Sequence, residues 1–290
     1  MIIDSHIHML PRRVRNDRTS FCEEDRAFGL LYSSKKARLA SGEDIIGYLD
    51  ESGIDKAVVF GFPWGSHDLV AENNDEIWDF HQRYPNRVIP FGVLSPIGGE
   101  RICRETERVL SAGFAGIGEL AMYRGGWTQA DFEALNPVLK LAAEAGAPVL
   151  IHVNEPVGHH YPGKLPVDFA ELLKMIESNP DVDFILAHFG GGVFIYALMP
   201  ELRRVFAGTY LDTAASPFLY DPKIFDVACK IMGRDKILFG SDFPLLPLGR
   251  YLKDFERARL DGQLRMAILG ENAARLLLKE SSGRTLYKTT

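Results

Sequence analysis

Two histidines stand two residues apart at the start of the chain, in the segment MIIDSHIH. The apolar residues around them predict a β-strand over residues 2–8. In a strand, positions i and i+2 point to the same face with about 7 Å between their Cα atoms, so His6 and His8 share a face. Desolvating two neighbouring imidazoles costs free energy unless a partner compensates for it, and a metal ion is such a partner.

Further polar residues stand at the ends of other apolar segments. Glu119, His152, His188 and Asp242 each close a run rich in β-branched and aromatic residues, and Asp212 closes another. Taken alone, each histidine is more simply explained as a hydrogen-bonded core or rim residue. Together with the first pair, these residues offer the imidazole and carboxylate donors that first-row transition metals prefer, and zinc is the metal we expect.

Eight apolar segments alternate with segments of helical periodicity, which is the pattern of βα units in a parallel sheet. The predicted strands are residues 2–8, 56–61, 88–93, 115–119, 148–152, 182–188, 209–212 and 236–242. This pattern favours an α/β fold of the (β/α)8 TIM-barrel type, in which the carboxyl ends of the strands meet at one mouth. An open doubly wound sheet is the alternative, but the first strand-to-helix turn lacks the GxGxxG motif of that fold.

The barrel is expected to form one domain over residues 1–280, with two departures from the βα rhythm. Residues 9–42 form a long polar connection after the first strand, which predicts a lid or a substrate-facing excursion. Residues 281–290 have little to bury and are expected to form a C-terminal tail. Within the barrel, apolar periodicity predicts helices over residues 131–145 and 167–178.

Composition narrows the partners and the compartment. A net charge of −6 and a pI near 5.8 argue against nucleic acid, because binding a phosphate backbone requires a basic surface. The longest apolar tract is interrupted by His188 and three glycines, so no association with a membrane is expected. Three cysteines in no paired spacing, and no recognisable secretion signal, lead us to expect a cytoplasmic protein with free thiols.

Five motifs resemble, in order, those of the amidohydrolase superfamily of metal-dependent barrels: DSHIH, LIHVNEP, ILAHFGG, ILFGSDFP and LGENAARLL. They are most similar to the amidohydrolase-related (amidohydrolase 2) branch, which includes aminocarboxymuconate semialdehyde decarboxylase-like proteins. The resemblance extends from residue 2 to about residue 278. It implies a divalent metal at the strand ends and makes a homodimer a possible assembly.

The resemblance also implies roles for the strand-end residues. The implied metal ligands are His6, His8, His152 and Asp242. Asp242 can also take the proton of a bound water, whereas His188 either binds a second metal or polarises the substrate. Glu119 either bridges two metals or orients a histidine ligand. One ion is favoured, and two remain open.

This donor set predicts a metal-dependent hydrolase, in which a metal-activated water cleaves an amide, ester or lactone of a small, carboxylate-bearing molecule. The alternative is a metal-dependent non-oxidative decarboxylase of an aromatic or unsaturated carboxylic acid, with Asp242 or His188 protonating the carbon. A barrel that binds a ligand without catalysis is the alternative of another class. We disfavour it because the full set of donors is present.

The loop after the fifth predicted strand, HVNEPVGHHYPGK, carries more polar and aromatic side chains than a connector needs. Asn154, His159, Tyr161 and Lys164 are the candidates for substrate binding, with Lys164 facing a substrate carboxylate. Trp64, after the second strand, is the candidate for lining the pocket. A solvated loop with turn-forming prolines and glycines explains the same segment.

Overall fold

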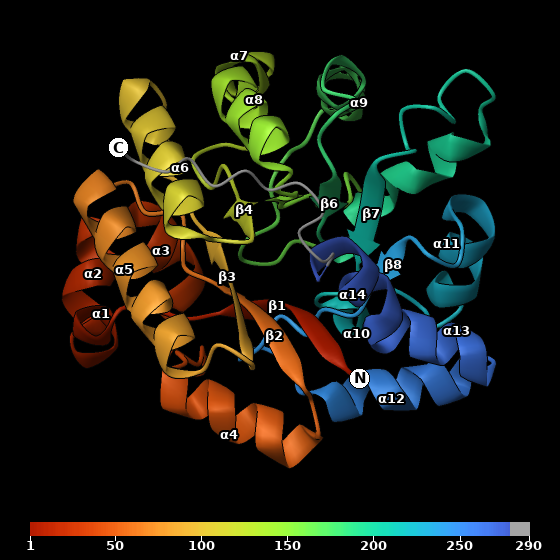
Figure 1. Ribbon diagram of the computed structural model, residues 1–290, viewed down its shortest axis with the longest axis horizontal. Helices are drawn as coiled ribbons and strands as arrows, with labels where there is room; N and C mark the ends of the chain where they lie inside the picture. Colours follow the sequence, from red (N-terminus) through yellow and green to blue (C-terminus); the bar gives the residue numbers. More distant parts are fainter. Residues whose placement is uncertain (279–290) are drawn as a thin grey trace, which may run out of the picture.

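Eight parallel strands surrounded by helices form the protein, whose computed structural model describes residues 1–278 (Figure 1). The strands are hydrogen-bonded in sequence order from β1 to β8. Their bounds are β1 Ile3–His8, β2 Lys56–Phe60, β3 Val88–Gly92, β4 Gly116–Leu120, β5 Val149–Ile151, β6 Phe184–Leu186, β7 Thr209–Asp212 and β8 Ile237–Leu238. The prediction of a (β/α)8 barrel is confirmed, and only β4 extends beyond its predicted range, by one residue.

The segment that follows the short strand β8 closes the barrel against β1. The Ser5 N–H donates to the Phe239 carbonyl (2.7 Å), and the Asp242 N–H donates to the His6 carbonyl (3.0 Å). The His8 N–H donates to the carbonyl of Phe243 (3.0 Å). These bonds hold Asp242 beside the two histidines of β1, although the residues lie at opposite ends of the sequence.

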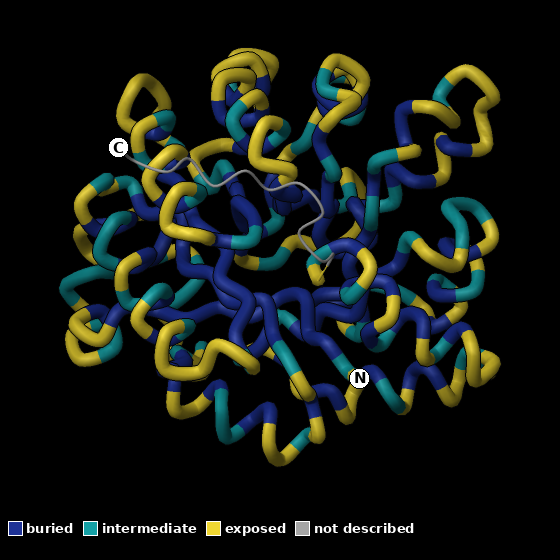
Figure 2. Tube along the Cα trace, in the orientation of Figure 1, coloured by how far each residue is buried: buried dark blue, intermediate teal, exposed yellow. Residues whose placement is uncertain are grey.

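The strands are buried on both faces, as expected for a parallel sheet covered by helices. Every residue of β1, β3, β4, β5, β6 and β8 is buried. Figure 2 shows this buried inner layer, with the exposed residues on the outer surfaces of the helices. Polar residues inside such strands, among them His6 and Glu119, must therefore find partners within the protein.

The helical segments that connect the strands begin and end close to sequence signals. α4 starts with a capping box between Ser41 and Asp44 and ends at Gly53, whose φ is 66°. The helix predicted over residues 131–145 is divided into α7 and α8 at Leu135, because Pro137 lacks the N–H that would continue one helix. The bounds are α1 Arg12–Asn16, α2 Arg18–Glu24, α3 Arg26–Tyr32, α4 Gly42–Ser52, α5 His67–Arg83, α6 Glu100–Ala112, α7 Gln129–Ala134, α8 Asn136–Ala145, α9 Phe169–Ser178, η1 His188–Leu198, α10 Ser216–Leu219, α11 Ile224–Met232, α12 Leu248–Arg257, α13 Gly262–Met266, η2 Ala267–Glu271 and α14 Asn272–Leu277.

The long connection after β1 folds into α1, α2 and α3, which lie beside α5 in Figure 1. The Arg12 N–H donates to Glu76 of α5, and the Arg13 side chain pairs with Glu72 (2.7 Å). Phe28 of α3 is fully buried and packs against Trp64, with 4.8 Å between the ring centroids. The excursion is therefore fixed on the barrel, and its last helical residue, Tyr32, reaches the cavity described below.

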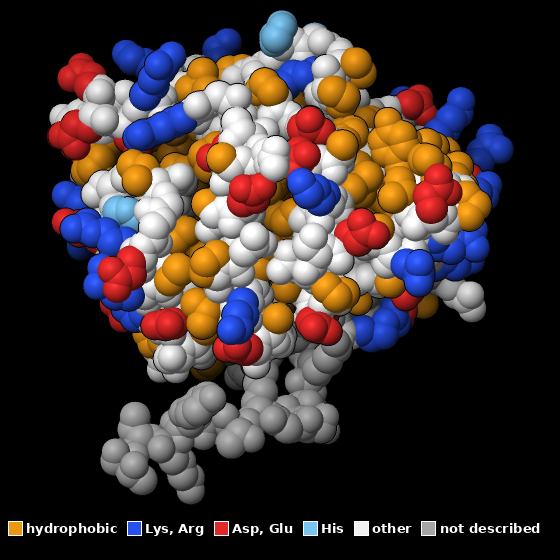
Figure 3. Space-filling view, turned by 90° about the horizontal axis from the view of Figure 1, so that it is seen from above, with side chains coloured by type: hydrophobic (Ala, Val, Ile, Leu, Met, Phe, Trp, Pro, Cys, Tyr) orange, Lys and Arg blue, Asp and Glu red, His pale blue; other side chains and the backbone are white. Residues whose placement is uncertain are grey.

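Basic and acidic side chains are interspersed over the face shown in Figure 3. Within residues 1–278, no helix combines the length and the apolar character needed to span a bilayer. The predicted tail, residues 281–290, lies outside the described residues.

Candidate metal centre

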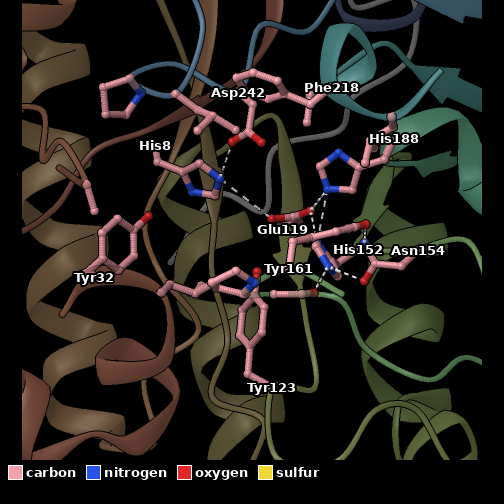
Figure 4. A pocket seen from close by; sticks show the side chains of 18 of the residues that line it. His8, Tyr32, Glu119, Tyr123, His152, Asn154, Tyr161, His188, Phe218 and Asp242 are labelled. Atoms are coloured by element: carbon pink, nitrogen blue, oxygen red, sulfur yellow. Dashed lines mark hydrogen bonds and ion pairs between the residues drawn. The ribbon is translucent and has the colours of Figure 1, made fainter. Parts of the chain in front are cut away.

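The carboxyl ends of the strands bring the predicted donors together at one cavity, and all of them except the fully buried His6 line it (Figure 4). β1 supplies its histidine pair and β4 supplies Glu119. His152 directly follows β5, His188 is the first residue of η1 after β6, and Asp242 follows β8. Residues spread over most of the chain thus face one another because each lies at the same end of its strand.

The first donor group lies on the β1 side of the cavity. The Nε2 atoms of His6 and His8 are 3.3 Å apart. Glu119 Oε2 lies 3.8 Å from His6 Nε2 and 3.7 Å from His8 Nε2. Asp242 Oδ1 lies 3.8 Å and 3.3 Å from the same two nitrogens. Two imidazoles and two carboxylates therefore point at one volume, which is the donor chemistry of a divalent metal site.

The second donor group lies on the β5 side and shares Glu119. Glu119 Oε1 is 2.9 Å from His152 Nδ1 and 3.7 Å from His188 Nε2. The two imidazole nitrogens are 3.2 Å apart. Glu119, the least certain residue of the predicted ligand set, is therefore central, since each of its oxygens faces a different histidine pair.

The outer nitrogen of each imidazole contacts an acceptor, and this fixes the position of the ring proton. His6 Nδ1 faces Asp212 Oδ2 (2.8 Å), and His8 Nδ1 faces the Gly61 carbonyl (3.3 Å). On the other side, His188 Nδ1 faces the Ala214 carbonyl (3.0 Å), and His152 Nε2 faces the Gly163 carbonyl (3.1 Å). Carboxylates and carbonyls only accept, so each outer nitrogen keeps a proton, and an imidazole in its neutral form directs its lone pair to the inside of the site. A cation between the facing nitrogens of each pair compensates for their repulsion, and both a proton and a divalent metal ion meet this need.

The electrostatics of the β1 side also favour a cation. Burial alone lowers the pKa of His6, but the negative charges of Asp212 and Glu119 outweigh it and raise this pKa to about 10. Burial raises the pKa of Glu119, but the charges of His152 and His6 lower it to about 2. Burial likewise opposes ionisation of Asp242, whereas its hydrogen bond with His8 and the charge of His6 hold its pKa well below the usual range. Both carboxylates are thus ionised at neutral pH.

The β5 side is more weakly charged. Burial, together with the neighbouring His152, lowers the pKa of His188 below its ordinary value. For His152 the penalty of burial is outweighed by Glu119, so its pKa is raised. Only one carboxylate serves this pair, because Glu119 is the sole acidic residue in the donor group that contains both histidines within residues 1–278.

His188 and Asp242 adopt left-handed backbone conformations, with φ of 57° and 60°. Such conformations are uncommon outside glycine and are often found at functional sites. The left-handed region continues through Phe189 and the glycines that follow it. Gly191 packs so closely that a Cβ there would lie 2.2 Å from the carbonyl oxygen of Asn154. The glycine-rich turn after β6 therefore packs against the start of the loop after β5.

The cavity above the donors has a volume of about 470 Å3, large enough for a small aromatic molecule. Of the predicted substrate-binding residues, Asn154, His159 and Tyr161 line it. Arg38, Tyr32 and Tyr123 line it as well but were not predicted. The remaining walls are largely apolar: Leu31, Phe62, Phe218, Leu219 and Leu245.

The structure places Lys164 and Trp64 away from the cavity wall. The Lys164 ammonium pairs with Glu155 (3.4 Å) and donates to the carbonyls of Val157 and His159, so it holds its own loop together. Trp64 is fully buried, and its indole N–H donates to Asn73 Oδ1 (3.0 Å). The cavity-lining cation is instead Arg38, which has no hydrogen-bond or ion-pair partner among residues 1–278.

A family model described as amidohydrolase matches residues 3–278. The chain belongs to the amidohydrolase family. This confirms the family resemblance of the sequence motifs. A search of curated protein sequences finds no match for this chain.

Solved structures align with this member of the family over nearly the whole chain. The 5-carboxyvanillate decarboxylase of Sphingomonas paucimobilis has a TM-score of 0.77 at 14% identity, with 96% of this chain and 98% of that chain covered. The Novosphingobium aromaticivorans enzyme of the same name, complexed with manganese and 4-hydroxy-3-methoxy-5-nitrobenzoic acid, gives 0.74 at 17%, with 96% of each chain covered. The 2,6-dihydroxybenzoate decarboxylase from Rhizobium gives 0.71 at 14%, covering 96% and 98%. At these identities the likeness establishes the fold.

The expectation of a hydrolase is wrong in light of these comparisons. Several of the similar structures are decarboxylases of aromatic acids, which act on 5-carboxyvanillate or on dihydroxybenzoates. The donor set misled the prediction because metal-bound hydroxide and a metal-held substrate use the same imidazole and carboxylate ligands.

Proposed function

We propose that this amidohydrolase-family protein is a metal-dependent, non-oxidative decarboxylase of an aromatic carboxylic acid. One observation carries the proposal: full-length structural neighbours include several decarboxylases of hydroxylated benzoates. The aromatic walls of the cavity and the donors at its floor support it, because an aromatic ring can enter with its polar groups directed at the floor.

The metal site of the proposal is the β1-side donor group. His6, His8, Glu119 and Asp242 would hold the first ion, and His152 with His188 would hold either a proton or a second ion beside Glu119. Two similar decarboxylases contain manganese, whereas the imidazole-rich donor set suits zinc equally well. Elemental analysis of the purified protein distinguishes the two metals and gives one or two ions per chain.

The substrate of the proposal carries an acidic group and a hydroxyl group. Arg38 has no hydrogen-bond or ion-pair partner in the described part of the chain and offers a fork of N–H donors to a carboxylate. Burial raises the pKa of the Tyr32 and Tyr123 phenols, and the charge of Glu119 raises it further, so both hydroxyls stay protonated. Neither hydroxyl bonds to another described residue, which leaves both free to donate to a ligand.

The reaction replaces a C–C bond of the substrate by a C–H bond. When bound, a divalent ion supplies fixed positive charge that orients the substrate's oxygens and stabilises charge developing on the ring. Asp242, ionised in the free protein, takes the proton of the substrate hydroxyl and returns it to the ring carbon that bears the carboxylate. The C–C bond then breaks, its electron pair restores the aromatic ring, and carbon dioxide leaves. The phenolate product regains a proton from water.

The test is the release of carbon dioxide from 2,6-dihydroxybenzoate, 5-carboxyvanillate and unsubstituted benzoate by the metal-loaded protein. We expect release from at least one hydroxylated acid and none from benzoate, which lacks the hydroxyl proton. Asp242→Asn is the matched control and should release none. A metal-loaded wild type that decarboxylates no hydroxylated aromatic acid in a broader panel would contradict the proposal.

A further inference from the structure

Asp212, at the end of β7, contacts both donor pairs with a single side chain. It is fully buried. Its Oδ2 lies 2.8 Å from His6 Nδ1. Its Oδ1 accepts the backbone N–H groups of His188 (2.9 Å) and Ala214 (3.0 Å). Within residues 1–278, His6 is the one ion-pair partner of Asp212. Burying a carboxylate costs free energy unless it is hydrogen-bonded, and both oxygens of Asp212 are bound to the segments that carry His6 and His188.

We infer that Asp212 is a positioning residue that fixes the tautomer of His6 and the backbone of His188, so that both donor pairs face the cation site. A carboxylate can only accept, so it keeps the His6 proton on Nδ1 and leaves the Nε2 lone pair directed at His8 and Glu119. Its other oxygen holds the N–H of His188 in the left-handed conformation. The inference rests on the proposed metal centre and not on the proposed reaction.

The substitution Asp212→Asn keeps the size of the side chain but replaces one accepting oxygen by a donating NH2 group. In Asp212→Asn, the backbone N–H groups of His188 and Ala214 require the amide oxygen at the Oδ1 position. The amide NH2 must then face His6 Nδ1 and donate to it. His6 consequently carries its proton on Nε2, which points into the cation site and can no longer serve as a ligand.

Asp4 offers a matched control on β1. It is also fully buried, and its Oδ1 accepts the backbone N–H groups of His6 (3.2 Å) and Ser241 (2.9 Å). Its Oδ2 accepts from the hydroxyl of Tyr48 (3.1 Å) rather than from an imidazole. In Asp4→Asn the amide NH2 can donate to that hydroxyl, which also accepts, so no histidine changes its tautomer.

The experiment measures Zn2+ binding to the full chain, stripped of metal, by competition with a chromophoric chelator. We expect the Kd of the first Zn2+ to rise roughly 10- to 100-fold in Asp212→Asn and to change by less than about threefold in Asp4→Asn. Thermal unfolding of both variants checks that they fold. In 15N-histidine NMR spectra of the Zn2+-loaded protein, the wild type should show the His6 proton on Nδ1, with His6→Gln used to assign the signal.

Three results would overturn the inference. The first is a folded Asp212→Asn variant with wild-type Zn2+ affinity, and the second is an equal loss of affinity in Asp4→Asn. The third is a His6 proton on Nε2 in the wild-type spectrum, which is informative even where Asp212→Asn does not fold. A wild type that binds no divalent metal would instead overturn the metal centre itself, whatever the variants do.

Discussion

The β1 side and the β5 side of the cavity have the same number of imidazoles but different charge. On the β1 side, two histidines face both Glu119 and Asp242, and Asp212 supports one of them from behind. On the β5 side, Glu119 alone serves two histidines, whose outer N–H groups donate to neutral acceptors. Two sites with the same number of imidazoles can therefore differ in their affinity for a cation. The additional negative charge on the β1 side should make it bind a cation first.

The loops above the two sides differ in whether their basic side chain is available to a ligand. The excursion after β1 brings Arg38 to the cavity without a hydrogen bond or ion pair to any residue of the described chain, whereas Lys164 binds carbonyl groups of its own loop and Glu155. One cation is therefore available to a ligand and the other is committed to structure.

Removing a ligand on the β1 side should have the largest effect. We expect His8→Ala to lose the first metal ion and to lower kcat/KM on the order of a thousandfold or more, because an ion contributes several kcal/mol to stabilising developing charge. Elemental analysis and carbon dioxide release measure both quantities. His67→Ala, outside the cavity lining, is the control. A His8→Ala protein with full metal content would remove the distinction between the two sides.

A matched change on the β5 side should cost less. His152→Ala is expected to retain one metal ion per chain while kcat/KM falls by roughly 10- to 100-fold, since Glu119 loses a partner that orients it. The same two assays apply. Loss of all metal in His152→Ala would show that the two histidine pairs hold one ion jointly.

The two loop cations give a third comparison. Arg38→Ala should raise KM by roughly 10- to 100-fold with little change in kcat, because a charge-assisted hydrogen bond to a ligand carboxylate contributes about 1.5–3 kcal/mol. Lys164→Met should leave KM within a fewfold of the wild type and should lower the thermal midpoint instead. Steady-state kinetics and thermal unfolding separate the two outcomes, and a reversed pattern would assign the substrate to the β5-side loop.

The smallest effect is a gradual change of stability with pH in the metal-free protein. The pKa of His6 is raised from 6.5 to about 10, so its charged form stabilises the fold fully below about pH 6.5, and this contribution is lost as the pH rises towards 10. Urea unfolding should therefore show a falling free energy of unfolding over this interval. His6→Gln should remove the slope, and His188→Gln should retain it. A slope that depends on His188 alone would place the charge on the β5 side.

The barrel and its donors could be predicted from the sequence. The limits of each apolar segment indicate where a strand ends, and therefore which residues lie at its carboxyl end. Once eight strands are assigned, His152 and Asp242 must approach the first histidine pair, whatever their sequence separation. The position of Glu119 between the two histidine pairs could not be predicted from the sequence, because it depends on which carboxylate oxygen faces which pair.

Other residues of the site depend on loop conformation, which periodicity does not report. Arg38 and Tyr32 lie in an excursion with no simple repeat, and Arg38 is one of several basic residues there, so the sequence did not distinguish it. Trp64 lies in a short turn after β2 that directs it to the aromatic core. Lys164 is committed because its loop folds back on itself, a contact that no spacing rule predicts.

The close packing of Gly191 against the Asn154 carbonyl means that positions around the cavity differ in how well they tolerate substitution. A substitution at Gly191 is expected to disrupt this packing, since even one added methyl group would collide with the neighbouring backbone. Phe218 and Leu245, by contrast, are 56% and 53% exposed and border the mouth of the same cavity. We therefore expect substitutions at the entrance to change the substrate range with less cost to folding than substitutions at Gly191.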